Sequence, residues 1–227
     1  MKKIINFKAI PIFIMFLCVQ LSAQEKINQF DLQGNRNGVW KKYYSNNNIR
    51  YQGEFKAGKE IGVFKYYSIT SSEHPTVIKK FNAGNNIASV NFYTVEGILE
   101  STGEMEGINR IGKWLYYHPD GKTLMIEENY KNGILEGTFK SYYKTGRVTE
   151  ILNYKGGKLH GNTKRFADNG ALLDDLNYCN GKLEGIAKYY NVDGELIYTG
   201  NYANDEKVGE WEYYENGKKE NVNKLKQ

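Results

Sequence analysis

The sequence is poor in proline and cysteine, and no long apolar run follows residue 23. Its 227 residues include 3 Pro, 2 Cys and 3 His. So few cysteines argue against a small disulfide-built scaffold. The missing apolar runs argue against a bundle of membrane-spanning helices. The formal net charge of +5 is shared among 25% charged residues, and it gives no case for nucleic-acid binding.

The first 23 residues have the pattern of a secretory signal peptide. Three lysines flank the start of an apolar stretch over residues 9–19, and small residues at 22–23 precede Gln24. We therefore expect an exported protein that is periplasmic, on the outer surface or extracellular. An uncleaved anchor is an alternative, although the stretch is shorter than the ~20 residues of a membrane span. A lipoprotein attached through Cys18 is another, although bulky residues precede that cysteine.

An aromatic segment recurs eight times along the rest of the chain. Its clearest copy is Gly-Val-Trp-Lys-Lys-Tyr-Tyr at residues 38–44, and the spacing between copies is 24 to 26 residues. Such self-similarity is the signature of a repeat architecture. The copies start at residues 38, 62, 88, 112, 137, 161, 185 and 209.

Each copy is followed by turn residues and a second aromatic strand. Asp-Gly at 120–121 and Asn-Gly at 169–170 are typical of tight hairpin turns. One unit is therefore a β-hairpin of about 24 residues, and short turns join antiparallel neighbours. We predict an all-β fold without an α/β core: an elongated antiparallel meander of tandem β-hairpins of about 24 residues in a single-layer twisted sheet.

The repeat also predicts the domain organisation of the chain. We expect the signal peptide at residues 1–23, an N-terminal cap at 24–37, hairpin repeats at 38–217 and a basic tail at 218–227. Repeat arrays need atypical ends, which the second and fourth segments would supply.

The residue five positions after each start is always aromatic. We expect these rings to stack between adjacent hairpins as a one-dimensional core. The set is Tyr43, Tyr67, Tyr93, Tyr117, Tyr142, Phe166, Tyr190 and Tyr214.

Other aromatic residues remain as a candidate binding surface. They comprise the three tryptophans and the first tyrosine of several Tyr-Tyr pairs. The candidates are Trp40, Trp114, Trp211, Tyr66, Tyr116, Tyr189 and Tyr213.

The unit Gly-x-Trp-x-x-Tyr-Tyr, followed by Asn/Asp-Gly and Tyr-x-x-Gly-Lys-x-x-Gly, resembles the MORN-variant repeat of bacterial proteins. The clearest match is Tyr178–Gly185 running into Ala187–Tyr190, and the resemblance covers about residues 30–220. It implies hairpin repeats and roles in scaffolding or membrane-proximal protein contacts. Proteins of this kind are often described as YwqK-type antitoxins. The pattern departs from the family at the lengthened loop 68–76 and at Ala88, which replaces a starting glycine.

No constellation of catalytic residues stands out. His74, His118 and His160 lie in loops without partners at metal-ligand spacing, and Cys179 lies beside a turn. A surface acid repeated once per unit does not supply the asymmetric pair that acid–base catalysis needs. We therefore expect a protein that is not an enzyme and that has no cofactor or metal.

Three functions fit these observations. The first is an exported scaffold that binds a protein or a component of the cell envelope. The second, implied by the resemblance, is an antitoxin that sequesters a toxin. The third is a carbohydrate-binding module that uses exposed Trp40, Trp114 and Trp211. Contact of the tail lysines with an anionic membrane surface is a further alternative for the partner; these lysines are Lys218, Lys219, Lys224 and Lys226.

Overall fold

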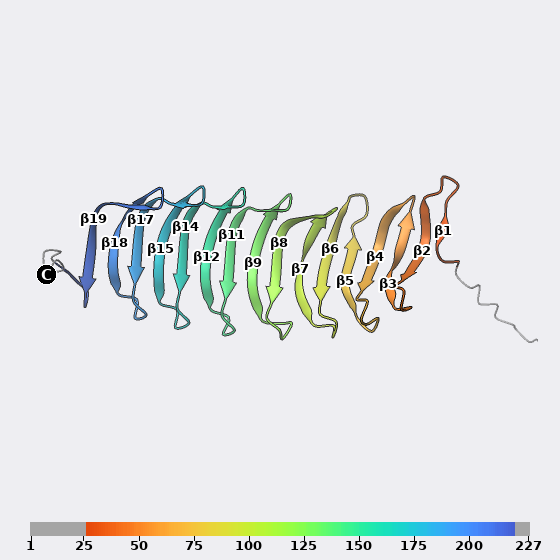
Figure 1. Cartoon of the computed structure of the whole chain (residues 1–227), viewed down its shortest axis with the longest axis horizontal. Helices are drawn as coiled ribbons and strands as arrows, with labels where there is room; N and C mark the ends of the chain where they lie inside the picture. Colours follow the sequence, from red (N-terminus) through yellow and green to blue (C-terminus); the bar gives the residue numbers. More distant parts are fainter. Residues whose placement is uncertain (1–25, 221–227) are drawn as a thin grey trace, which may run out of the picture.

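The computed structural model describes residues 26–220, and over this range the chain forms one open sheet of antiparallel strands without a helix (Figure 1). The all-β hairpin meander predicted from the repeat is confirmed. The expectations for residues 1–23 and for the end of the tail lie outside the described residues. The longer strands are β2 (Arg36–Tyr43), β3 (Ile49–Lys56), β4 (Lys59–Tyr67), β5 (Pro75–Phe81), β6 (Ile87–Tyr93), β7 (Leu99–Glu106), β8 (Asn109–Tyr117), β9 (Leu124–Lys131), β11 (Gly137–Tyr142), β12 (Val148–Lys155), β14 (Gly161–Phe166), β15 (Leu172–Cys179), β17 (Gly185–Tyr190), β18 (Leu196–Ala203) and β19 (Glu206–Glu215). The two-residue strands are β1 (Gln29–Phe30), β10 (Ile134–Leu135), β13 (Lys158–Leu159), β16 (Lys182–Leu183) and β20 (Lys218–Lys219).

Each strand pairs with the strands that precede and follow it in the chain. Figure 1 shows the result as a single extended row of hairpins, from β1 at one end to β19 at the other. The short strands β10, β13 and β16 continue, after a one-residue break, into β11, β14 and β17, and each such pair lies against the same neighbouring strand. The core of this protein must therefore form within one layer and not between two.

The starting glycine of each unit bends the strand that contains it. These glycines have φ between 61° and 90°, a conformation that glycine adopts without strain. The pairing with the preceding strand shifts register opposite Gly62, Gly112 and Gly209, as at a β-bulge. Ala88 replaces the glycine in the third unit, and there β5 and β6 pair without a shift. The glycine is thus the cause of the bulge.

Hydrogen bonds between successive turns hold the hairpins together along one long edge of the sheet. In each, the amide of a turn residue donates to a carbonyl in the preceding unit, and most of the distances are 2.8 to 3.1 Å. Because most units repeat the same bond, the stabilisation passes from neighbour to neighbour, as in other repeat proteins. The bonds are Gly58 N to Arg36 O, Gly107 N to Asn86 O, Gly133 N to Arg110 O, Gly157 N to Leu135 O, Gly181 N to Leu159 O and Asp205 N to Leu183 O.

The most deeply buried side chains lie two residues after the unit start, a place we call the ring position. Its occupants are Trp40, Phe64, Val90, Trp114, Phe139, Thr163, Ala187 and Trp211. All are buried except Phe139 and Trp211, which are half-buried, and Phe64, Val90 and Trp114 are completely inaccessible to solvent. The ring position therefore forms the core of the sheet.

The largest rings lie directly on a glycine of the preceding strand. A Cβ built on Gly53 would lie 2.5 Å from Cγ of Phe64, and one on Gly103 or Gly200 would lie nearer still to the ring of the next strand, Trp114 or Trp211. These three are the only ones among the 24 glycines without positive φ. Close packing and not backbone conformation is therefore the reason for glycine there.

Where the ring position holds a small residue, the preceding strand supplies a large one. The register of β12 with β14 continues to place Leu152 beside Thr163, and that of β15 with β17 continues to place Leu176 beside Ala187. The larger residue of the preceding strand fills part of the volume that a ring occupies in other units. The units thus use two versions of one packing solution.

The prediction that the rings five residues after each start stack between adjacent hairpins as a one-dimensional core is wrong. Tyr67 is buried, but Tyr43 is 52% exposed and the other members are half-buried. They lie on the opposite face from the ring position, where polar neighbours bind their hydroxyl groups: Gln52 Nε2 donates to Tyr67 Oη at 2.9 Å. These rings therefore cover a polar face.

Alanine variants at the ring position and at the aromatic position three residues later distinguish their contributions to stability. We expect Trp114→Ala to lower the free energy of unfolding by about 4 kcal/mol, because a fully buried ring is lost. Tyr142→Ala should cost about half as much, since that ring is half-buried. Urea unfolding of both variants checks the order, and a larger loss for Tyr142→Ala would contradict this description of the core.

Candidate functional site

Tyrosines form a row across the face of the sheet that carries the ring position, which we call the aromatic face. Residues paired across neighbouring strands share a face, and an unbroken series of pairs joins Tyr51 on β3 to Tyr213 on β19. At a strand spacing of ~4.8 Å the series is roughly 60 Å long. The tyrosines of this series, which we call the tyrosine row, are Tyr51, Tyr66, Tyr116, Tyr189, Tyr198 and Tyr213. The positions between them hold Val77, Phe92, Ser101, Ile126, Ser141, Glu150, Arg165 and Asp174.

The rings of the row stand beside one another in groups. Tyr189 and Tyr198 are stacked, with centroids 4.4 Å apart, and Tyr213 follows at 6.0 Å. At the other end, Tyr51 and Tyr66 are 6.1 Å apart. Because neighbours cover much of the ring faces, the row presents ring edges and hydroxyl groups to solvent. All its members are half-buried.

The tryptophans are enclosed between the sheet and a cationic side chain. The guanidinium group of Arg36 lies 5.2 Å from the ring of Trp40, and that of Arg110 lies 4.5 Å from the ring of Trp114. Trp40 and Trp114 are 3% and 0% exposed. The interpretation of these two residues as exposed sugar-binding rings is therefore wrong. Trp211 is half-buried beneath Lys207, whose Nζ lies 4.1 Å from its ring.

Arg110 also organises the tyrosines around it. Its Nη1 donates to the hydroxyl groups of Tyr116 and Tyr130, and Tyr130 Oη donates to Glu128 at 2.7 Å. Burial raises the pKa of Tyr116 well above its ordinary value, and hydrogen bonding with Glu128 raises it further. Burial and the hydrogen bond to Glu60 likewise raise the pKa of Tyr66. These hydroxyl groups remain protonated donors at every physiological pH.

The opposite face is polar. Five of its lysines lie three residues after a unit start, and acids from neighbouring strands balance part of their charge. Lys113 Nζ lies 2.8 Å from Glu127, and Lys164 Nζ lies 3.6 Å from Asp175. This lysine face, which also carries the half-buried rings described above, holds Lys41, Lys65, Lys140, Lys164 and Lys188.

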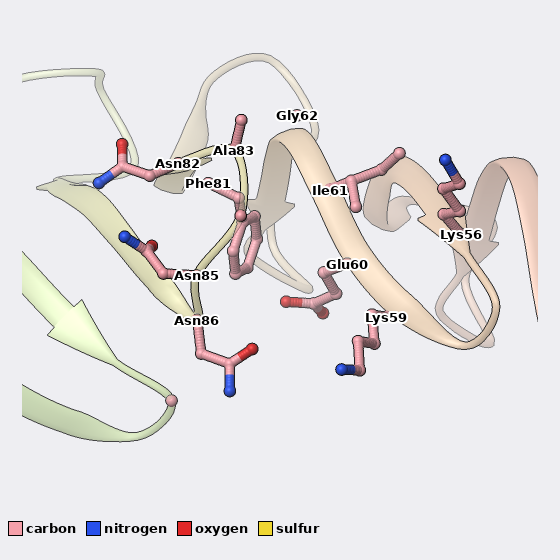
Figure 2. A pocket seen from close by; sticks show the side chains of 12 residues that line it. Lys56, Lys59, Glu60, Ile61, Gly62, Phe81, Asn82, Ala83, Asn85 and Asn86 are labelled. Atoms are coloured by element: carbon pink, nitrogen blue, oxygen red, sulfur yellow. The ribbon is translucent and has the colours of Figure 1, made fainter.

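A hollow of about 810 Å³ lies at the degenerate third unit. Figure 2 shows the ring of Phe81 between the side chain of Glu60 and the asparagine-rich turn 82–86. The turn-to-turn hydrogen bonds are interrupted here, because no turn amide donates to Glu60 O within the described residues. The turn residues that line the hollow are exposed, so we attribute it to the irregular repeat and assign it no ligand.

The structure brings together only part of the candidate surface. Tyr66, Tyr116, Tyr189 and Tyr213 lie in one row, whereas the tryptophans lie beneath cations. Sequence reasoning missed Tyr51 and Tyr198, which belong to second strands of their units; their alternation with core residues is the signal that would have found them.

Residues 26–220 contain no cluster of His, Cys, Asp or Glu that could hold a metal ion. The same range contains no helix able to cross a membrane. The single cysteine of this part of the chain, Cys179, is exposed and unpaired at a turn.

Comparison with known families identifies the repeat. The family model of the MORN repeat variant matches residues 36–57, 110–132 and 135–155. A search among curated proteins finds no match. MORN repeats are generally linked to protein or membrane interaction. Three segments of the chain therefore match the MORN repeat variant, and they contain Trp40, Arg110, Trp114 and Phe139.

The raised pKa values predict how stability responds to alkali. Up to pH 10, the ordinary pKa of tyrosine, the folded and unfolded chains both keep the hydroxyl protons of Tyr116 and Tyr189. Above it only the unfolded chain loses them, so stability falls as pH rises. We expect the double variant Tyr116→Phe, Tyr189→Phe to lose stability less steeply between pH 10 and 11.5. Thermal midpoints measured against pH check this, and identical slopes would contradict it.

Proposed function

We propose that the protein is an exported, non-enzymatic scaffold that binds a partner protein with the tyrosine row of its aromatic face. The observation that carries the proposal is the row itself, which extends across most of the sheet. Tyrosine is enriched at the centres of protein interfaces, because it combines a large apolar area with a hydroxyl group and few rotatable bonds.

The orientation of the rings favours a protein over a carbohydrate. Stacking of a sugar requires a free ring face, whereas Tyr198 has a neighbouring ring at 4.4 Å on one side and another at 6.0 Å on the other. Ring edges and hydroxyl groups suit the side chains and backbone of a polypeptide. Hydrogen bonds hold the hydroxyl groups of Tyr66, Tyr116 and Tyr189 in place, which lowers the entropic cost of binding.

Export is supported by the lysines and the apolar stretch of the first 23 residues. In that compartment the partner would be another exported protein or a protein of the cell envelope. A secreted toxin is one such protein, so the antitoxin role is a special case of the same binding activity.

Adjacent tyrosines on opposite faces allow a matched test. Tyr189 belongs to the row, and Tyr190 lies on the lysine face. Each is replaced in turn by the photo-crosslinking residue p-benzoylphenylalanine in cells that produce the protein, and adducts are identified by mass spectrometry. We expect a discrete protein adduct from position 189 and none of the same mass from position 190.

The pair Tyr116 and Tyr117 repeats the comparison at the middle of the sheet. The same adduct from 116 and not from 117 would extend the contact along the row. Equal adducts from both members of each pair, or no protein adduct from either row position, would overturn the proposed function.

A further inference from the structure

Three charged residues occupy consecutive positions of the series of pairs on β12, β14 and β15, between Tyr116 and Tyr189. Glu150 is paired with Arg165, and Arg165 is paired with Asp174. Asp174 is in turn paired with Tyr189, where the rings resume. The charges therefore lie on the aromatic face, in line with the proposed binding surface.

A hollow of about 300 Å³ opens at this interruption. Leu152, Leu176, Tyr178 and Tyr189 contribute to its walls. Thr163 at the ring position also lines it. Small residues at this and the next ring position leave the space that a tryptophan or phenylalanine fills in other units.

Asp174 is buried in this hollow, yet half of its carboxylate has no partner. The residue is 6% exposed. Arg165 Nε donates to Oδ2 at 2.8 Å, and Nη2 lies 2.6 Å from the same oxygen in an ion pair. No group within residues 26–220 donates to Oδ1. This oxygen therefore remains able to accept a hydrogen bond from a ligand.

Glu150 and Asp174 bring two negative charges to the hollow, and Arg165 brings one positive charge. Lys164 also lines the hollow, but its Nζ lies 3.6 Å from Asp175 on the lysine face. The charges of the aromatic face at the hollow are therefore negative overall. The Arg165 side chain is 60% exposed. Burial raises the pKa of Tyr178 above its ordinary value, and the negative charge of Asp174 raises it further.

One wall is suited to a cation. Tyr189 has Tyr198 stacked on one ring face, so its other face is directed toward β15 and Asp174. A cation over a tyrosine ring and beside a carboxylate gains both attractions. The leucines provide an apolar surface for an aliphatic stem.

We propose that this hollow is the specificity pocket of the binding face and that it receives a lysine side chain of the partner protein. The inference rests on the proposed function. The ammonium group donates to Asp174 Oδ1 and Glu150, and the four-carbon stem lies against Leu152 and Leu176. An anionic group bound through Arg165 is the opposite outcome, which the experiment separates.

The probe is the pentapeptide Gly-Gly-Lys-Gly-Gly with blocked ends, compared with the same peptide carrying Glu in place of Lys. Each is titrated into the isotope-labelled protein, and backbone amide shifts are followed by NMR. We expect saturable shifts from the lysine peptide, confined to β12, β14, β15 and β17, and none from the glutamate peptide.

Two conservative variants and one control locate the binding. We expect Asp174→Asn and Glu150→Gln each to weaken the lysine peptide at least about fivefold, since a full charge is removed without loss of volume. Glu150→Gln leaves the Arg165–Asp174 pair intact, so it tests the pocket even where the first variant is destabilised. Asp175→Asn, one residue away on the lysine face, should bind as the parent does.

Tighter binding of the glutamate peptide would overturn the inference in favour of an anion site. Absence of saturable shifts with either peptide, or an equal loss in the Asp175→Asn control, would also overturn it. In each of these cases the crosslinking pairs at 189/190 and 116/117 still test the proposed function independently. If adducts form only at the row positions and the lysine peptide causes no shifts, the proposed function holds and the lysine pocket does not.

Discussion

The structure depends on the contact between a large ring and a glycine of the preceding strand. A single-layer sheet has no second layer to cover its apolar side chains, so each ring must find its contacts within the layer. Gly53, Gly103 and Gly200 allow a ring to lie directly on the backbone. A cation then covers the other side of the ring, as Arg110 covers Trp114. The ring is thereby buried without a conventional core.

Variation in this contact creates the features that bear on function. Where Thr163 and Ala187 take the place of the ring, leucines of the preceding strands fill only part of the volume, and the charged hollow opens. In three units that keep the ring (Phe64, Trp114 and Trp211), the residue two places later on the same strand is a tyrosine: Tyr66, Tyr116 and Tyr213. The adjacent ring holds each of these tyrosines half-buried. The proposed binding face is thus a consequence of how the ring position is packed in each unit.

The repeat spacing and the turn residues were sufficient to predict the hairpins, because period and glycine position determine strand length and bend. They were not sufficient to predict which side chains are most deeply buried. The residue at the ring position varies from Trp40 to Val90 to Ala187, whereas the residue three places later is aromatic in every unit. The prediction followed the uniformly aromatic position and therefore assigned the core to the wrong face of the sheet. Gly103 in the middle of a strand was the available signal. No sequence signal pointed to the pair Arg165–Asp174, because the register between their strands is what brings the two residues together.

A double-mutant cycle between Gly103 and Trp114 tests the ring-on-glycine contact most directly. A Cβ at Gly103 would collide with the ring, so Gly103→Ala should lower the free energy of unfolding by about 2 kcal/mol in the parent. In a Trp114→Thr background, which copies Thr163, the added methyl group meets no ring, and the same change should be close to neutral. An equal loss in both backgrounds would contradict the account.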